Sequence, residues 1–266
     1  MSEESKPMTN KPNILMIVTD QEYAHQPMPA GFVLPSRERI RARGVTFNNH
    51  HATTTVCTPS RYSILTGRYN WRSWLKRGVT DGYSRPLIER DRLTVASLLR
   101  SSGYATACVG KWHLGWTWPR TGDGEDAIDY GGVIPDGPTA LGFDYFYGIS
   151  ASLDMPPYVY VENDRPTARP DRVVPASSGP AFWREGPIAP DFKHEEVLPV
   201  LTRKALDWTE RQAGSGRPFF LYFALPAPHT PIVPRPEFQG RSGTNAYGDF
   251  CLQVDAVVGE VLDVLD

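Results

Sequence analysis

A nucleophile and a fixed positive charge lie one helical turn apart near the middle of the N-terminal third of the chain. The run begins at Cys57, continues through Pro59 to Arg61, and closes at Gly67 after a short apolar segment. Proline suits the first turn of a helix, because its φ is already helical and its missing N–H has no partner to lose there. Cys57 is therefore expected just ahead of a helix N-terminus, where free N–H groups and the helix dipole favour an anion. Arg61 adds forked donors suited to sulfate or phosphate oxygens, so the stretch predicts a site for a tetrahedral oxyanion.

Asp20 follows a continuous apolar run, 13–19, of the kind that forms a central strand buried on both faces. In open α/β sheets, sites lie at the C-terminal ends of the strands. Asp20 is therefore a candidate site residue. The alternative is an aspartate that only caps the turn that follows.

Two further apolar runs, 104–109 and 219–225, are also followed by polar side chains. Lys111 and His113 come after the first run, and residues two apart in an extended chain project to the same side. His229 comes after the second run and is held between prolines. We expect all three at the edge of a parallel sheet. Surface decoration for the first pair, and a packing role for His229, are the alternatives.

The remaining histidine pair and cysteines have plainer interpretations. His50 and His51 lie in a polar loop that precedes Cys57 and are expected to be solvated. Cys108 lies inside an apolar run and is expected to be a buried structural thiol. With Cys57 and Cys251 it makes an odd, widely spaced set, which predicts neither a zinc site nor a disulfide framework.

Three blocks of this sequence together resemble the type I sulfatases of the alkaline phosphatase superfamily. They are Cys57-Thr-Pro-Ser-Arg61 with its downstream Leu-Thr-Gly-Arg68, the GKWHLG block at 110–115, and the His-x-Pro that begins at His229. The resemblance implies an α/β fold with an alkaline-phosphatase-like, mostly parallel sheet sandwiched by helices. It extends over 13–266 but covers only the N-terminal portion of that family's fold. We therefore expect a disordered tail, 1–12, and then the N-terminal portion of a catalytic domain, 13–266, with the C-terminal part of the fold missing.

The resemblance also implies a mechanism. In that family the cysteine is oxidised after translation to formylglycine, and the formylglycine-generating enzyme reads the C-x-P-x-R pattern. One hydroxyl of the hydrated aldehyde at Cys57 would attack sulfur, and the other would later expel sulfate. Arg61, Lys111 and His229 would stabilise charge on the transferring group, and His113 would orient or deprotonate the diol.

A divalent metal follows from the same resemblance: Ca²⁺, or another ion such as Mg²⁺ or Mn²⁺. Asp20 and the modified Cys57 are its expected ligands. Many family members carry a second Asp where this chain has Gln21, which makes Gln21 a further candidate ligand and resembles the phosphonate monoester hydrolase and choline sulfatase branch. The later ligands of the family have no counterpart here, while Ca²⁺ takes six or more oxygens. We therefore expect a truncated form that carries half of the site.

Ser152 and Asp154 follow a further strand candidate, 143–149. By the same resemblance, a polar side chain in this neighbourhood reaches the sulfate, so both are candidate substrate-binding residues. An ordinary turn explains them as well. The Gly- and Pro-rich stretches 116–139 and 165–190 are expected to be loops that shape the substrate pocket.

Hydrophobic periodicity and capping residues predict the other elements. Ser36 is a possible N-cap and Gly44 a possible end of a basic amphipathic helix. Helices are expected at 34–43, 92–102, 194–212 and 247–265, and short strands at 45–47 and 158–163.

Composition sets outer limits on partners and location. The chain has 266 residues and a formal net charge of -2, which allows one or two domains and argues against a surface coated for nucleic acid. The first apolar run is too short to span a membrane. We expect no nucleic-acid partner and no membrane partner, and a cytoplasmic location, or a periplasmic or secreted one if a signal has been removed. Oligomeric state stays open.

These observations predict an arylsulfatase-like sulfuric ester hydrolase that acts on a small-molecule or glycan sulfate ester, that is, an aryl or carbohydrate sulfate. A phosphonate or phosphate diester hydrolase of the same superfamily is one alternative. A catalytically inactive truncated homologue that serves in binding is another. A thiol redox protein is disfavoured, because no second cysteine lies near Cys57.

Overall fold

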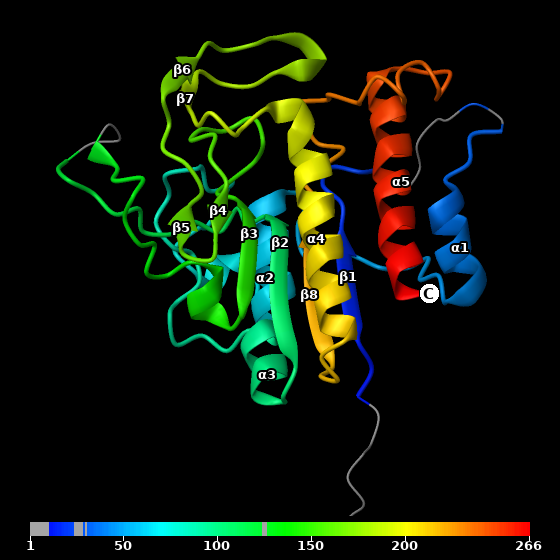
Figure 1. The fold of residues 1–266 in the computed structure, drawn as a ribbon, viewed down its shortest axis with the longest axis horizontal. Coiled ribbons are helices and arrows are strands. Elements are labelled where there is room, and N and C mark those ends of the chain that lie inside the picture. Colours follow the sequence, from blue (N-terminus) through cyan, green and yellow to red (C-terminus); the bar gives the residue numbers. More distant parts are fainter. Residues whose placement is uncertain (1–10, 24–28, 30, 124–126) are drawn as a thin grey trace, which may run out of the picture.

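The computed structural model describes residues 11–23, 29, 31–123 and 127–266. Within them the main sheet has the order β1-β8-β2-β3-β4-β5 (Figure 1). The first four run parallel and the last two pair antiparallel at one edge. Their bounds are β1 (Ile14–Val18), β8 (Phe219–Ala224), β2 (Ala105–Lys111), β3 (Tyr145–Ile149), β4 (Val161–Glu162) and β5 (Arg165–Pro166).

The central strands are the apolar runs of the sequence. Every residue of β2 and β8 is buried, as expected for strands covered on both faces. β1 is only partly buried, because it lies at the edge of the sheet. Gly110 of β2 pairs with Gly148 of β3, and a side chain on either glycine would collide with a neighbouring strand. These glycines allow the close approach that brings the strand ends together.

Helices cover both faces of the sheet. α4 (Val197–Ala213) crosses one face, and α2 (Cys57–Thr66) and α3 (Val95–Ser101) lie on the other (Figure 1). α5 (Ala246–Leu265) packs against α4 and against α1 (Pro35–Arg43). The predicted mostly parallel sheet sandwiched by helices is confirmed.

Short elements fill the connections. A separate ribbon is formed by β6 (Arg172–Val174) and β7 (Gly186–Ile188) within the predicted loop 165–190. The 3-10 turns are η1 (Asn70–Arg72), η3 (Pro138–Leu141), η4 (Gly179–Ala181) and η5 (His194–Glu196).

Three local predictions are wrong. Ser36 does not cap α1: the helix begins at Pro35, and the Ser36 N–H instead donates to the Asp255 carboxylate on α5 at 2.9 Å. α1 buries none of its residues, so it is not amphipathic in its packing. The 45–47 stretch is no strand, and Val45 and Phe47 are 80% and 77% exposed. Among the described residues no neighbouring strand offers it backbone partners, and propensity alone does not make a strand.

The other predicted strand, 158–163, is reduced to β4 because only two residues find a ladder partner on β3. The predicted tail 1–12 lies almost wholly outside the described residues, and the division at residue 13 stays a prediction. No helix in the described ranges is long and apolar enough to cross a membrane.

Candidate active site

The parallel strands carry polar residues at their C-terminal ends, and these ends lie side by side along one side of the sheet. Asp20 comes two residues after β1, Lys111 is the last residue of β2, and His229 lies in the turn after β8. The N-terminus of α2 is brought to the same edge, with Cys57 as its first residue. Pro59 lies in the first turn and Gly67, with φ 65°, ends the helix, as predicted.

Asp20 is the centre of the cluster. The ammonium of Lys111 donates to Oδ2 of Asp20, and Nη2 of Arg61 lies 3.4 Å from the same oxygen. All three side chains are buried. Burial alone would raise the pKa of Asp20, but Lys111 and Arg61 outweigh burial and hold that pKa well below its usual range. The carboxylate is therefore kept charged.

Arg61 is held rigidly from behind. Its Nη1 donates to the Lys111 carbonyl at 2.7 Å and its Nη2 to the Leu225 carbonyl at 3.3 Å. These two carbonyls belong to the ends of two neighbouring strands, so the guanidinium is fixed by the sheet itself. A buried and immobile guanidinium presents its charge to a ligand at little entropic cost.

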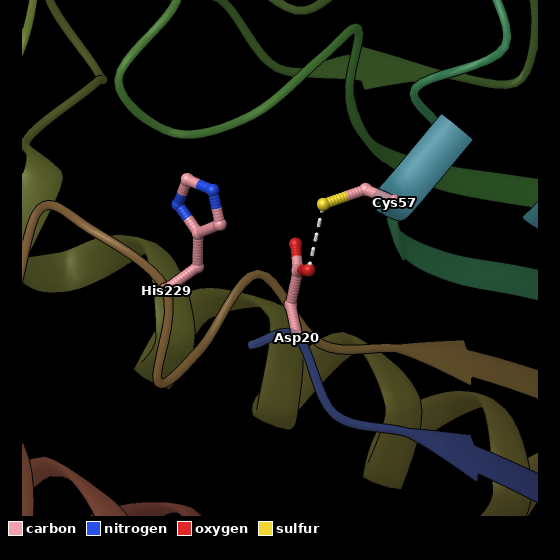
Figure 2. Close-up of side chains that lie close together, drawn as sticks. All are labelled: Asp20, Cys57 and His229. Atoms are coloured by element: carbon pink, nitrogen blue, oxygen red, sulfur yellow. Dashed lines mark hydrogen bonds between the residues drawn. The ribbon is translucent and has the colours of Figure 1, made fainter. Parts of the chain in front are cut away.

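Cys57 faces Asp20 across the site. Its thiol donates to Oδ1 of Asp20 at 2.9 Å, and Figure 2 shows the sulfur and the His229 imidazole on opposite sides of the carboxylate. Burial raises the pKa of the Cys57 thiol, and Lys111 only partly offsets it. The unmodified thiol is therefore a poor nucleophile near neutral pH.

Ser152 lies between Lys111 and His229 and contacts both. Its hydroxyl accepts from the Lys111 ammonium at 3.0 Å and lies 3.2 Å from Nδ1 of His229. His229 Nδ1 also contacts the Thr230 carbonyl at 2.6 Å. A carbonyl only accepts, so Nδ1 carries the proton and Nε2 carries the lone pair. Burial, reinforced by Lys111, lowers the pKa of His229.

His113 is locked in an unusual backbone conformation beside the cluster. Its φ is 57°, and its carbonyl accepts from the hydroxyls of Thr58 and Thr80, each at 2.9 Å. Nε2 lies 2.7 Å from the Thr80 carbonyl and must donate, which leaves the buried Nδ1 as an unpartnered lone pair among the described residues. Burial, with Lys111, lowers the pKa of His113 far below 6.5. The imidazole is a neutral base.

The remaining two predicted residues stand apart. Asp154 is buried, but one of its oxygens pairs with Arg184 of the 165–190 loop and the other has no hydrogen-bond partner among the described residues. Gln21 is exposed with φ 55°, and its carbonyl accepts from the Tyr247 hydroxyl at 2.8 Å. It lines a hollow of about 330 Å³ with Asp20 and Cys57. The structure thus places Gln21 at the rim rather than in the cluster.

The donor set suits part of a divalent-cation site. Ligand atoms of Asp20, Cys57 and His229 lie within 4.8 Å of one another (Figure 2). His229 was expected only as a sulfate contact, and its Nε2 lone pair makes it a candidate ligand as well. One carboxylate, one imidazole and residue 57 fall short of the six or more oxygens that Ca²⁺ takes.

Thr58 and Thr80 are the positioning residues that sequence reasoning missed. Thr58 is the variable position of the C-x-P-x-R pattern, and Thr80 lies in a loop with no distinctive pattern. Their shared contact with His113 exists only because the chain folds back over 22 residues. No sequence signal marks that contact.

Comparison with known proteins gives a consistent result. The sequence model of the Sulfatase family matches residues 12–266. An N-acetylgalactosamine-6-O-sulfatase of Bacteroides thetaiotaomicron is 33% identical, over 97% of this chain and 56% of that protein. Arylsulfatase A of Bos taurus is 30% identical, over 94% and 48%.

A solved structure agrees with these sequence matches. It is described as a protein of glycosaminoglycan metabolism in Bacteroides thetaiotaomicron, and it superposes with a TM-score of 0.77 at 30% identity, over 96% of this chain and 59% of that one. The alkaline-phosphatase-like fold is thereby confirmed. The chain spans about half the length of the curated relatives it matches.

Proposed function

The chain belongs to the sulfatase family, and on that premise we propose that it is a sulfuric ester hydrolase acting on a sulfated carbohydrate or an aryl sulfate. One observation carries the proposal. Two buried cations, Lys111 and Arg61, face a single carboxylate, Asp20, beside the first residue of α2. The surplus positive charge, added to the positive end of the helix dipole, favours a bound anion such as a sulfate ester.

Residue 57 would supply the nucleophile. Its formylglycine form, made by the formylglycine-generating enzyme, would provide a hydrated aldehyde whose oxygen attacks sulfur. The raised thiol pKa and the hydrogen bond to Asp20 favour this modification as the source of reactivity, since the thiol itself stays protonated.

The neighbouring side chains then have distinct tasks. Lys111 and Arg61 hold fixed positive charge where negative charge develops on the transferring group. Ser152, held by Lys111, would donate to a sulfate oxygen, and His229 would contact the same group. The neutral His113 would take a proton at its free Nδ1. Asp154, with its one unpartnered oxygen, would bind a substrate hydroxyl or amide.

Asp20, residue 57 and His229 would hold a divalent cation such as Ca²⁺, Mg²⁺ or Mn²⁺, with Gln21 a weaker candidate ligand at the rim. When bound, the ion supplies further positive charge to an anionic ester. Three protein groups do not complete its shell, so other oxygens must contribute.

The carbohydrate class follows from the relatives. The first is named for a 6-O-sulfated N-acetylgalactosamine, and the superposed structure is described in terms of glycosaminoglycans. We therefore propose a glycan sulfate ester as the natural substrate. A cytoplasmic location stays a prediction.

Two measurements test this function. A peptide mass map of the purified chain reports whether residue 57 is an aldehyde or a thiol, and the aldehyde is expected. Initial rates on an aryl sulfate and on a phenyl phosphonate monoester then separate sulfatase from phosphonate hydrolase chemistry. Faster turnover of the phosphonate would overturn the sulfatase assignment.

A further inference from the structure

A surface segment beyond the C-terminal end of α2 has a composition unlike the rest of the chain. It consists of Tyr69, Trp71, Arg72, Trp74, Lys76 and Arg77, and we name it the aromatic–basic platform. We propose that this platform binds a sulfated polysaccharide at a second contact, away from the reaction site. The proposal rests on the proposed function for its choice of ligand.

The aromatic rings are exposed and held in place. Tyr69 and Trp71 stack with ring centroids 4.0 Å apart and 10° between planes, although they are 47% and 52% exposed. Trp74 is 38% exposed, its indole N–H donates to the Pro86 carbonyl at 2.8 Å, and the Arg85 guanidinium lies 4.9 Å from its ring centroid. Large exposed aromatics that gather in one segment mark an interaction surface. Fixed rings also lose little entropy on binding.

The cations of the platform have no carboxylate to neutralise them. Arg72, Lys76 and Arg77 are exposed, and none forms an ion pair with any described residue. Lys76 Nζ instead donates to the carbonyls of Trp71 at 2.7 Å and Ser73 at 2.6 Å, which holds its charge beside the stacked rings. The sequence has no acidic residue between Gly67 and Thr80, although the whole chain has a net charge of -2.

A sulfated polysaccharide matches both halves of this surface. The C–H faces of sugar rings pack on exposed aromatic rings, and guanidinium groups bind sulfate oxygens with forked donors. A single-stranded nucleic acid is the competing ligand, since it also uses stacking and basic side chains. We favour the polysaccharide because the platform follows the C-terminal end of α2, the helix that begins with Cys57.

The geometry makes the platform a separate contact. α2 has ten residues, which corresponds to about 15 Å at 1.5 Å per residue. A polymer held at one end of this helix keeps its other sulfated units near the other end. The platform would thereby raise the local concentration of ester groups without touching the reacting atoms.

Binding of chondroitin sulfate to the purified chain, measured by titration in low salt, tests the proposal. Trp71→Ala combined with Arg72→Ser, and separately Tyr69→Ala combined with Arg77→Ser, should each weaken binding at least about 10-fold and flatten its dependence on salt, because each removes a stacking surface and a charge. The matched control, Phe47→Ala combined with Arg241→Ser, replaces an exposed ring and an exposed cation elsewhere and should bind as the wild type does.

Three outcomes would overturn the proposal: unchanged binding by both platform variants, equal wild-type binding of desulfated chondroitin, or tighter binding of single-stranded DNA. Unfolding transitions confirm that the variants fold. Turnover of a small aryl sulfate is measured in parallel and should be the same in the variants and the wild type. Failure of the wild type to turn over that ester counts against the proposed function, whereas the binding series alone decides the platform.

Discussion

The ammonium of Lys111 donates a hydrogen bond to the carboxylate of Asp20 in the buried floor of the site. The two residues are 91 positions apart in the sequence and meet because β1 and β2 end at the same edge of the sheet. Their pairing, joined by Arg61, keeps Asp20 charged and leaves a surplus of positive charge beside Cys57. The stability and the chemistry of this edge therefore depend on the same contacts.

Lys111→Met is expected to lower the free energy of unfolding by about 3 kcal/mol, because it leaves the buried Asp20 carboxylate with the more distant Arg61 as its ion-pair partner. Urea unfolding followed by circular dichroism measures the loss. Lys204→Met removes a partly exposed lysine that pairs with Glu162 and should cost about 0–1 kcal/mol. Equal stability losses in the two variants would contradict the role given to the buried pair.

His194 predicts a specific pH dependence of stability. It is buried against Trp183, and burial lowers its pKa to about 4 from an ordinary 6.5. Above pH 6.5 the His194 side chain is neutral in both the folded and the unfolded protein, so its titration does not change the free energy of unfolding. As the pH falls from 6.5 to 4, only the unfolded state takes up the proton, so the free energy of unfolding falls by about 3 kcal/mol from this group.

His194→Phe keeps an aromatic ring against Trp183 and removes the proton site. The decline of stability between pH 6.5 and 4 should therefore be shallower in this variant, by up to that amount. His50→Phe, at an exposed position, should retain the wild-type slope. Parallel slopes in His194→Phe and the wild type would show that His194 titrates normally.

Gly110→Ala tests whether the close packing of β2 against β8 at Gly110 positions Lys111. Gly110 has φ 124°, and a Cβ there would lie 1.9 Å from the Ala224 carbonyl oxygen of β8. We expect a loss of about 3 kcal/mol or more, because both the backbone and the neighbouring strand must move. Gly214→Ala, with an ordinary φ of -83° and open space around it, should be neutral or about 0.5 kcal/mol stabilising. A well-folded Gly110→Ala protein of wild-type stability would refute this account.

Thr58→Val tests how His113 is held. The Thr58 hydroxyl donates to the His113 carbonyl at 2.9 Å and accepts from the Thr80 N–H at 3.2 Å. Replacing it leaves buried polar groups under-satisfied and should cost about 1–3 kcal/mol in thermal or urea unfolding. Thr121→Val, at an exposed hydroxyl, is the control and should be near neutral. A cost no larger than the control's would remove Thr58 from the support of His113.

Periodic and apolar patterns predicted the fold well, because burial on both faces leaves a plain signature in β2 and β8. The ends of these two strands and of β1 then located Lys111, His229 and Asp20 without knowledge of their contacts. The failures concern features that depend on a tertiary neighbour. The N–H of Ser36 found an acceptor on α5, and the stretch at 45–47 found no strand to pair with.

The sequence predicted which residues form the candidate site, but not which of their side chains contact one another. Spacing brought Cys57 and Arg61 into consideration, and the family resemblance brought Ser152. The thiol's hydrogen bond to Asp20 and the contact of Ser152 with His229 emerge only in three dimensions. Gln21 shows that adjacency in sequence does not ensure adjacency in the site. It neighbours Asp20 in sequence, yet its backbone turns it to the rim.

The rate of sulfate release from an aryl sulfate, with the chain co-expressed with a formylglycine-generating enzyme, tests the central claim most directly. We predict measurable release that falls at least about 1,000-fold in Cys57→Ala, because the nucleophile is removed while the cation pocket remains. Equal rates in the two proteins, or no release by a folded wild type whose residue 57 is shown to be the aldehyde, would contradict the account.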